Sequence, residues 1–380
     1  MDAKTRQPAR NLSAGYEDQF SPALHILDEA IAARVFPGCA FGVLALGDPD
    51  KEIQLQGARG RFTYDQDSPA VTPETVYDIA SLTKVVATTA TVMLLVQRGL
   101  LDLKTPLGDL LPEFLVGRSS ADPARQVKLH HLLAHNSGLP GYVKFFETTR
   151  TPQDLLKACL GLSLEADPGT RAEYSDPGFI LLGKALEALT HESLATWTER
   201  KIFRPLGMTA TGFCPPPAAR PLIPPTEEDR AFRQRRIQGE VQDENASLLG
   251  GIAGQAGLFS NIPDLLRFAR QVLPEVSDTG SPRLFAEATI ASFAKRQIPE
   301  GSSRALGWDT PSGNSSSGHH FSSRSIGHLG YSGCSLWIDL EASVAVTLLT
   351  NRTWPDRQNQ AIRQLRPAFH DAIREVLPCM

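Results

Sequence analysis

The sequence predicts a mixed α/β (α+β) fold in which both ends of the chain build one antiparallel sheet. Near the N-terminus, the apolar stretch Cys39 to Leu46 and the alternating stretch Glu52 to Gln56 are typical of a hairpin. Near the C-terminus, Ser335 to Ile338 and Val344 to Leu349 form a second strand pair. The long stretch between the two pairs has mostly helical patterns. We therefore expect a sheet flanked by the terminal helices, with a largely helical region inserted.

The individual elements follow from spacing and from turn residues. Apolar residues recur at helical spacing from about Ser21 to Val35, and Phe36-Pro37-Gly38 ends that helix. The N-terminal hairpin turns at Gly47-Asp48-Pro49-Asp50. A C-terminal helix is expected from about Gln358 to Val376. The helical patterns in between are Leu129 to Ala134, Thr151 to Leu160, Phe179 to Leu189, Leu194 to Ile202 and Pro263 to Val272.

One stretch is apolar on every side. It runs from Val85 to Val96, is interrupted only by threonines, and ends at Arg98-Gly99 with a basic last turn and a C-cap glycine. Such a helix belongs in the interior. We predict a sheet domain of residues 1–80 and 260–380, an inserted helical domain of residues 81–259, and an active site at their junction, where clefts form.

Composition narrows the class of function. The 380 residues carry a formal net charge of -4 and no lysine or arginine run, which argues against nucleic-acid or membrane partners. The N-terminus lacks the apolar core of a secretory signal, and the longest apolar run is too short to span a bilayer. The five cysteines are odd in number, scattered and never in C-x-x-C spacing. We expect a soluble, cytoplasmic protein with free thiols that binds a small molecule.

A serine and a lysine stand three residues apart at the start of the apolar helix. Ser81 and Lys84 would lie one turn apart on the same face, close enough for the amine to reach the hydroxyl, as in an activated nucleophile. The alternative is that Ser81 is only an N-cap and Lys84 a solvated residue. A second copy of the pattern, Ser292 with Lys295, has no apolar helix behind it, and we interpret it as the end of a surface helix.

Two further stretches are unusual as plain structure. Tyr174-Ser175-Asp176 stands at the start of a helix, although Asp176 before Pro177 could simply be a helix N-cap. Gly327-His328-Leu329-Gly330-Tyr331 leads into a strand, and its glycines suit an edge that a ligand approaches closely. A bulged edge strand would look the same.

In this order the three stretches resemble the serine β-lactamase and penicillin-binding-protein superfamily, in its class C β-lactamase-like branch, which includes family VIII esterases. The branch pattern is S-x-x-K, then Y-x-N, then K-T-G or H-x-G. In this chain these are Ser81 to Lys84, Tyr174 to Asp176 and His328 to Gly330. Other segments, such as Gly250 to Ser260, are similar too. The resemblance covers roughly Ser21 to Val376 and implies the β-lactamase/transpeptidase-like fold.

The resemblance also implies roles for the residues. Ser81 would be the nucleophile, with Lys84 and Tyr174 sharing the task of taking its proton. The backbone N–H groups of Ser81 and Tyr331 would form the oxyanion hole. Asp176, His328, Leu329 and Gly330 would contact the substrate. No metal and no cofactor are implied, and the oligomeric state is left open.

The chain departs from the family pattern at two places. Asp176 stands where the family usually has asparagine, and an ionised carboxylate there would hold Lys84 charged, so that it could not be the base. Either Asp176 is protonated, or Lys84 acts mainly as a charge that lowers the pKa of Tyr174. In the third motif, His328 replaces a permanent positive charge and Leu329 a hydroxyl. Efficient hydrolysis of β-lactams, whose carboxylate those groups bind, is therefore not expected.

The leading hypothesis is a serine hydrolase of small esters or amides with weak β-lactam turnover. The alternatives are a true β-lactamase or D-amino-acid peptidase, and a penicillin- or muropeptide-binding protein without turnover. Two other hydrolase types are not indicated. Gly330-Tyr331-Ser332-Gly333 lacks the last glycine of a nucleophile elbow, and His130, His131 and His135 lack H-E-x-x-H order. We expect His135 to stabilise a turn.

Overall fold

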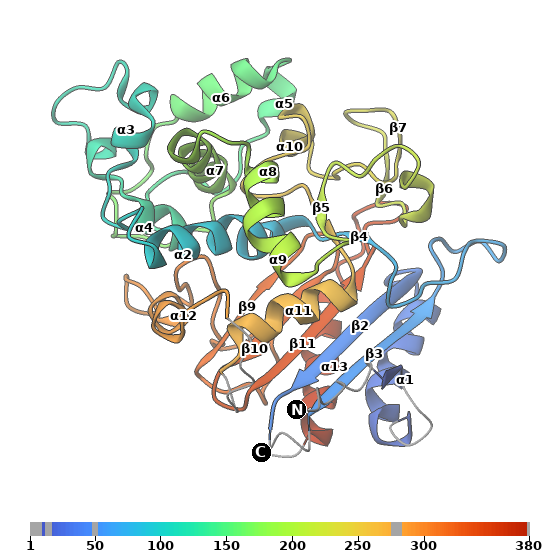
Figure 1. Cartoon of the computed structure of the whole chain (residues 1–380). Helices are drawn as coiled ribbons and strands as arrows, with labels where there is room; N and C mark the ends of the chain where they lie inside the picture. Colours follow the sequence, from blue (N-terminus) through green and yellow to red (C-terminus); the bar gives the residue numbers. More distant parts are fainter. Residues whose placement is uncertain (1–9, 12–16, 48–51, 275–282, 378–380) are drawn as a thin grey trace.

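The main sheet is built from both ends of the chain. The computed structural model describes residues 10–11, 17–47, 52–274 and 283–377 (Figure 1). Its strands are β1 (Arg10–Asn11), β2 (Gly38–Ala45), β3 (Ile53–Gly60), β9 (Ser325–Leu329), β10 (Ser335–Asp339) and β11 (Val344–Thr350). They lie in the order β1-β3-β2-β11-β10-β9, and all neighbours are antiparallel except β1 and β3. The predicted antiparallel sheet and fold class are confirmed.

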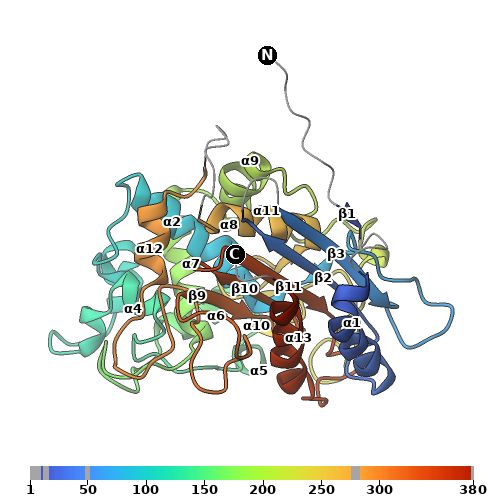
Figure 2. The ribbon, with the colours of Figure 1, turned by 90° about the horizontal axis from the view of Figure 1, so that it is seen from below.

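Different helices cover the two faces of this sheet (Figures 1 and 2). Helices α1 (Glu17–Ala32) and α13 (Ile362–Val376) pack on one face, where the rings of Phe41 and Phe369 lie 5.8 Å apart. Helix α11 (Ile262–Val272) covers the other, directly over Gly42, where a Cβ would lie 2.6 Å from Cγ2 of Ile262. Because side chains alternate along a strand, Phe41 and Gly42 face opposite helices.

The central helix is buried but not uniform. It consists of a 3₁₀ turn (Ala80–Leu82), a π-helical segment (Lys84–Thr89) and α2 (Ala90–Gln97), and Gly99 follows with φ +67° as the predicted terminator. By length and composition this helix could span a membrane, which the shorter apolar run in the sequence did not suggest. Within the fold, however, 83% of it is buried, as expected of a core helix.

The region between the two sheet halves is largely helical, as predicted. Its helices are α3 (Leu107–Leu110), α4 (Leu129–Leu133), α5 (Phe145–Thr148), α6 (Pro152–Leu160), α7 (Asp176–Thr190), α8 (Leu194–Thr198), α9 (Arg204–Leu206) and α10 (Glu244–Leu248). Helix α12 (Glu287–Ala294) lies between α11 and β9 along the chain. One hydrophobic cluster joins Leu182 of α7, Val92 of α2 and Leu336 of β10. The domain boundaries at residues 80 and 260 stay a prediction, because this core is continuous across them.

Two small sheets were not predicted. Strands β4 (Tyr77–Asp78), β8 (Leu258–Ser260) and β5 (Gly212–Phe213) form one, and β6 (Glu227–Asp229) pairs with β7 (Arg235–Ile237) in the other. Pairing of β4 with β8 sets Asp78 opposite Phe259, and Ile79 N–H donates to the Leu258 carbonyl at 3.1 Å. The chain is thus fixed in place just before Ser81.

Some predicted boundaries were wrong for local reasons. Helix α1 ends at Ala32, because Arg34 adopts φ +56° and Val35 N–H closes the end onto the Ala30 carbonyl. Helix α13 begins at Ile362, because the Asn359 side chain accepts from Ala361 N–H in a preceding turn. The predicted helix Leu194 to Ile202 divides into α8 and a π-helical segment, Glu199–Phe203. The predicted turn residues 48–50, and Cys379, lie outside the described residues.

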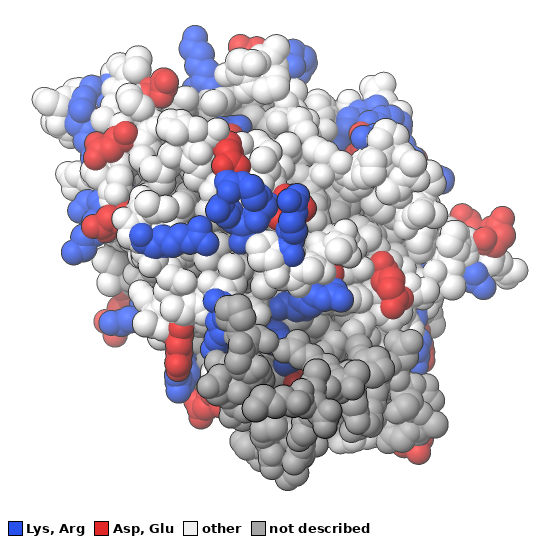
Figure 3. Space-filling view, in the orientation of Figure 1, with Lys and Arg blue, Asp and Glu red and all other residues white. Residues whose placement is uncertain are grey.

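The described cysteines are free thiols, of which Cys214 is exposed and Cys39, Cys159 and Cys334 are buried. On the face shown in Figure 3, acidic and basic side chains are interspersed over the described part of the surface. The mixed charges do not indicate a binding site on that face. Several polar groups with unusual environments, among them Lys84 and Tyr174, lie close to Ser81.

Candidate active site

Ser81 sits on a constrained turn between β4 and the central helix. Ala80, immediately before it, has φ +48°, a left-handed conformation that costs free energy in a residue with a side chain. The Asp78 side chain accepts from Ala80 N–H at 2.8 Å, and Leu82 N–H donates to the Ile79 carbonyl. The turn leaves Ser81 partly accessible while its neighbours on the helix are buried.

The Lys84 ammonium uses all three of its hydrogen-bond donors. Nζ donates to Ser81 Oγ at 3.1 Å, to Asp176 Oδ1 at 2.7 Å and to the Gln255 carbonyl at 3.0 Å. Burial by itself would lower the pKa of Lys84, but the Asp176 carboxylate and the Tyr174 hydroxyl outweigh it and raise the pKa. Lys84 is therefore charged in the resting state.

Tyr174 is positioned by the helix start and by a buried histidine. The His135 ring lies 4.5 Å from the Tyr174 ring, and His135 Nδ1 accepts from Ser175 N–H at 2.9 Å. His135 thus fixes the turn, as expected. Burial raises the pKa of Tyr174, whereas the nearby Lys84 ammonium and Ser81 lower it, and the net direction is upward. Tyr174 is a neutral phenol in the resting state rather than a preformed base.

Asp176 is not the cap of α7. Ser175 is the N-cap, since its Oγ accepts from Gly178 N–H at 3.1 Å, and Asp176 is the first helical residue. The interpretation of Asp176 as an N-cap was therefore wrong, and its carboxylate instead pairs with Lys84 across the site. A second carboxylate, that of Asp243, accepts a hydrogen bond from the side chain of Gln255, whose carbonyl binds Lys84. Burial and the Asp176 charge raise the pKa of Asp243 to about 7.

The third motif lies along the edge strand β9. His328 is 3% exposed, its Nδ1 lies 2.8 Å from the Leu329 carbonyl, and its ring is 5.8 Å from that of Tyr174. Burial, with smaller contributions from Lys84 and Arg304, brings its pKa well below the usual value, so the imidazole is neutral. Leu329 is half-buried. Gly330 packs so closely that a Cβ would lie 2.5 Å from the Ile79 carbonyl oxygen.

The loop after Gly330 is fastened to the Ser81 turn. Ser332 Oγ donates to the Asp78 carbonyl at 2.8 Å, and the buried Arg366 donates to the Gly330 carbonyl at 2.6 Å. Among the described residues, neither Ser81 N–H nor Tyr331 N–H has a hydrogen-bond acceptor. Two free donors on adjoining turns have the chemistry of an oxyanion hole.

Sequence reasoning assigned no role to several groups that complete this arrangement. Gln255 supplies a carbonyl to Lys84, and Asp243 accepts from the Gln255 side chain at 3.3 Å. Asp78 is 1% exposed, and its Oδ1 and Oδ2 accept from Ala80 N–H and Gln242 N–H. Asp78 immediately precedes the turn in the chain, which was the one available signal. Gln255 and Asp243 are far from Ser81 and Lys84 in the sequence, so no sequence pattern indicated their roles.

The role of Asp78 leads to a first prediction. Burial raises its pKa to about 6, although the two backbone N–H groups favour the anion. A folded-state pKa above the unfolded value means that Asp78 contributes stability at low pH, which is lost as the pH rises through about 6. We expect Asp78→Asn to lower kcat about tenfold, because one of the two N–H groups then faces the side-chain NH2 group of the asparagine, which is a donor and cannot accept.

Denaturant unfolding of both proteins at pH 7 and pH 5 checks the linkage. The parent should gain stability relative to Asp78→Asn between pH 7 and pH 5, because only the parent can take up a proton at position 78. An equal stability difference at the two pH values would contradict the assignment of a raised pKa to Asp78.

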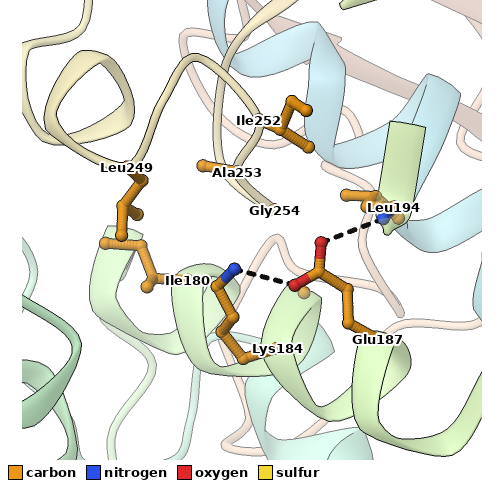
Figure 4. A pocket seen from close by; sticks show the side chains of 9 residues that line it. Ile180, Lys184, Glu187, Leu194, Leu249, Ile252, Ala253 and Gly254 are labelled. Carbon is orange, nitrogen blue, oxygen red and sulfur yellow. Dashed lines mark hydrogen bonds and ion pairs between the residues drawn. The ribbon is translucent and has the colours of Figure 1, made fainter. Parts of the chain in front are cut away.

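One pocket lies apart from this cluster. It is formed between α7 and residues 249–254, where Lys184 pairs with Glu187 at 2.7 Å and Glu187 accepts from Leu194 N–H (Figure 4). None of Ser81, Lys84 and Tyr174 lines it. We do not regard it as the catalytic site.

Comparison with known proteins places this geometry in context. A family model described as Beta-lactamase matches residues 26–368. A Salmonella agona protein named "Putative D-alanyl-D-alanine carboxypeptidase" is 30% identical over 366 residues, which cover 87% of this chain and 83% of that protein. Among solved structures, the hydrolase EstCE1, described as having promiscuous acyltransferase activity, superposes with a TM-score of 0.75 at 19% identity, covering 95% of this chain and all of that one. An octameric penicillin-binding protein homologue from Pyrococcus abyssi gives 0.66 at 21% identity, covering 91% and 76%.

Proposed function

The chain belongs to the Beta-lactamase family of serine hydrolases, and from this premise we propose that it hydrolyses small esters or amides through an acyl-enzyme on Ser81, with weak β-lactam turnover. The observation that carries the proposal is the contact of the Lys84 ammonium with Ser81 Oγ at 3.1 Å. A lysine held there by Asp176 and Gln255 places a proton carrier directly at the nucleophile.

The proton has to move for the reaction to proceed. As Ser81 Oγ bonds to the scissile carbonyl carbon, the hydroxyl proton leaves through Tyr174 and Lys84, and the carbonyl oxygen becomes an anion that accepts hydrogen bonds from the N–H groups of Ser81 and Tyr331. The same pair returns the proton to the leaving group as the carbon–leaving-group bond breaks. Water then attacks the acyl carbonyl carbon, one of its protons passes by the same route to Ser81 Oγ, and the bond between that carbon and Oγ breaks, which releases the carboxylic acid and restores the serine.

The resting ionisation favours one order of events. With Lys84 charged and Tyr174 neutral, a base forms only after one proton has left the cluster. Activity should therefore rise with pH on the alkaline side. The carboxylate of Asp176, rather than any property of Tyr174 alone, determines how high that pH is.

A second candidate is a D-amino-acid peptidase, which the name of the 30% identical relative favours. A third is a binding protein that is acylated once and does not turn over. The likeness to EstCE1 is at 19% identity and supports the fold alone. His328 in the third motif is neutral and so lacks the positive charge with which β-lactamases bind the β-lactam carboxylate. This supports an esterase rather than an efficient β-lactamase.

One preparation can separate these candidates. We expect steady turnover of p-nitrophenyl butyrate, much slower turnover of a chromogenic cephalosporin, and a transient acyl-enzyme by intact mass spectrometry, all absent from Ser81→Ala. Release of D-alanine from a peptide ending in D-alanyl-D-alanine, faster than ester hydrolysis, would favour the peptidase. A stable adduct without turnover of any substrate would contradict hydrolase function.

A further inference from the structure

One buried arginine binds the turn that follows β9. Arg366 of α13 is 5% exposed. Its guanidinium donates to three backbone carbonyls, those of Gly330 at 2.6 Å, Cys334 at 2.9 Å and Gly333 at 3.1 Å. Backbone hydrogen bonds from Gly330 N–H to the Cys334 carbonyl and from Gly333 N–H to the Gly330 carbonyl close the same turn. Arg366 thus contacts the turn that carries Tyr331 through its carbonyls.

The charge of Arg366 is balanced by these carbonyls alone. Among the residues that the structure describes, no carboxylate pairs with the guanidinium, and burial lowers the pKa of Arg366 to about 10, which leaves it charged at neutral pH. A buried cation without a carboxylate costs free energy unless other polar groups replace its water. Here the carbonyls of one turn replace it, so the arginine and the turn form one unit.

The planarity of the peptide bond connects this contact to the oxyanion hole. The Gly330 carbonyl and the Tyr331 N–H belong to one trans peptide unit, in which the two groups point in opposite directions. Because the Gly330 carbonyl is directed at Arg366 on α13, the Tyr331 N–H points away from α13. A cation at the carbonyl oxygen also polarises the peptide, which makes its N–H a stronger donor.

The turn that carries Ser81 packs directly against this loop. Ser332 Oγ donates to the Asp78 carbonyl at 2.8 Å, and a Cβ at Gly330 would lie 2.5 Å from the Ile79 carbonyl oxygen. Asp78 and Ile79 lie just before Ser81 in the chain. These contacts fix the position of the loop beside Ser81. They leave the orientation of the peptide that follows Gly330 to the groups that bind its carbonyl.

We propose that Arg366 is a positioning residue for the oxyanion hole, acting through the peptide between Gly330 and Tyr331 without contacting the substrate. While the guanidinium binds the Gly330 carbonyl, the Tyr331 N–H faces the oxygen that becomes an anion as Ser81 attacks. Without Arg366 this peptide can rotate, and the N–H is then misdirected. The inference rests on the proposed Ser81 hydrolase and adds to it a residue outside the three motifs.

Arg366→Met tests the proposal, because methionine is long and apolar but has no donor for the three carbonyls. We expect kcat and kcat/KM for p-nitrophenyl butyrate to fall together by about 10- to 100-fold, less than for complete loss of an oxyanion donor. The inhibition constant of an aryl trifluoromethyl ketone, whose adduct with Ser81 carries an oxyanion, should rise by the same factor as kcat/KM falls.

Arg366→Lys keeps a charged donor for the Gly330 carbonyl but not the fork that reaches all three carbonyls. Its kcat/KM should lie between those of Arg366→Met and the parent, about 3- to 10-fold below the parent. If Arg366→Met does not fold, this variant decides the question by the same two measurements.

Two controls separate the orientation of the peptide from a general loss of stability. Arg374→Met removes another largely buried arginine from α13, one that pairs with Asp339, and should leave kcat/KM close to that of the parent. Arg352→Met removes the donor to the Tyr331 carbonyl at 2.8 Å, which belongs to the next peptide unit. It should raise the inhibition constant of the ketone less than Arg366→Met does.

A kcat/KM for Arg366→Met within twofold of the parent would overturn the positioning role. So would a fall in kcat/KM that leaves the inhibition constant of the ketone unchanged, or that Arg374→Met or Arg352→Met shares in full, since either would indicate a general loss of order. Failure of the proposed function has a separate signature, namely ester hydrolysis that persists in Ser81→Ala.

Discussion

Ser81→Ala is expected to abolish covalent labelling by a fluorophosphonate and to lower ester turnover by at least ~10³, because without the nucleophile the whole acyl-enzyme route is lost. The structure makes the substitution a mild one. Ser81 is partly exposed on its turn, and its side chain accepts one hydrogen bond, from Lys84. Loss of activity with an unchanged unfolding transition would therefore report on chemistry. Labelling followed by intact mass measurement provides the check.

Ser292→Ala is the matched control. Ser292 and Lys295 repeat the S-x-x-K spacing, but both are exposed, at the end of α12 rather than at the start of a buried helix. We expect this variant to label and to turn over like the parent. If it lost activity while Ser81→Ala kept it, the assignment of the nucleophile would be wrong.

Asp176→Asn is expected to move the alkaline activation of ester hydrolysis to lower pH by about 1–3 pH units, the range for removing a charge in direct contact. Lys84 is completely buried, so burial lowers its pKa once the carboxylate 2.7 Å away is gone. The Asp176 charge also raises the pKa of Tyr174, and its removal acts in the same direction. Both proton carriers thus become bases at lower pH.

The profile of kcat/KM against pH, measured for both proteins, tests this expectation, since that ratio reports ionisations of the free enzyme. Asp243 provides a comparison, because it lies near the same ammonium without an ion pair to it. Asp243→Asn should move the alkaline limb less than Asp176→Asn does. A profile for Asp176→Asn that overlays the parent, or moves to higher pH, would rule out an ionised Asp176 as the group that keeps Lys84 charged.

The same experiment bears on which group is the base. One of the two alternatives from the sequence was that Lys84 acts mainly as a charge that lowers the pKa of Tyr174. Lys84 does act in that direction, but burial outweighs it. Because Lys84 and Tyr174 each shift the pKa of the other, the alkaline limb of the profile belongs to the pair.

The architecture and the residues of the three motifs could be predicted from the amino-acid sequence alone. Short, mostly apolar runs located β2, β10 and β11, because a strand buried on both faces is apolar along its length. The apolar helix behind Ser81 distinguished it from Ser292, because only a helix buried on all sides can be apolar on all sides. These signals are local, so a single sequence carries them.

The pairing and the ionisation of the motif residues became clear only from the folded chain. Ser175 rather than Asp176 caps α7, so the Asp176 carboxylate is free to reach Lys84, which is 92 residues away in the chain. His328 is neutral, and Arg304 adjoins Tyr174 from a segment without any motif. Burial and neighbouring charge set each of these properties. Both depend on which distant segments pack together, and no pattern within one segment records that.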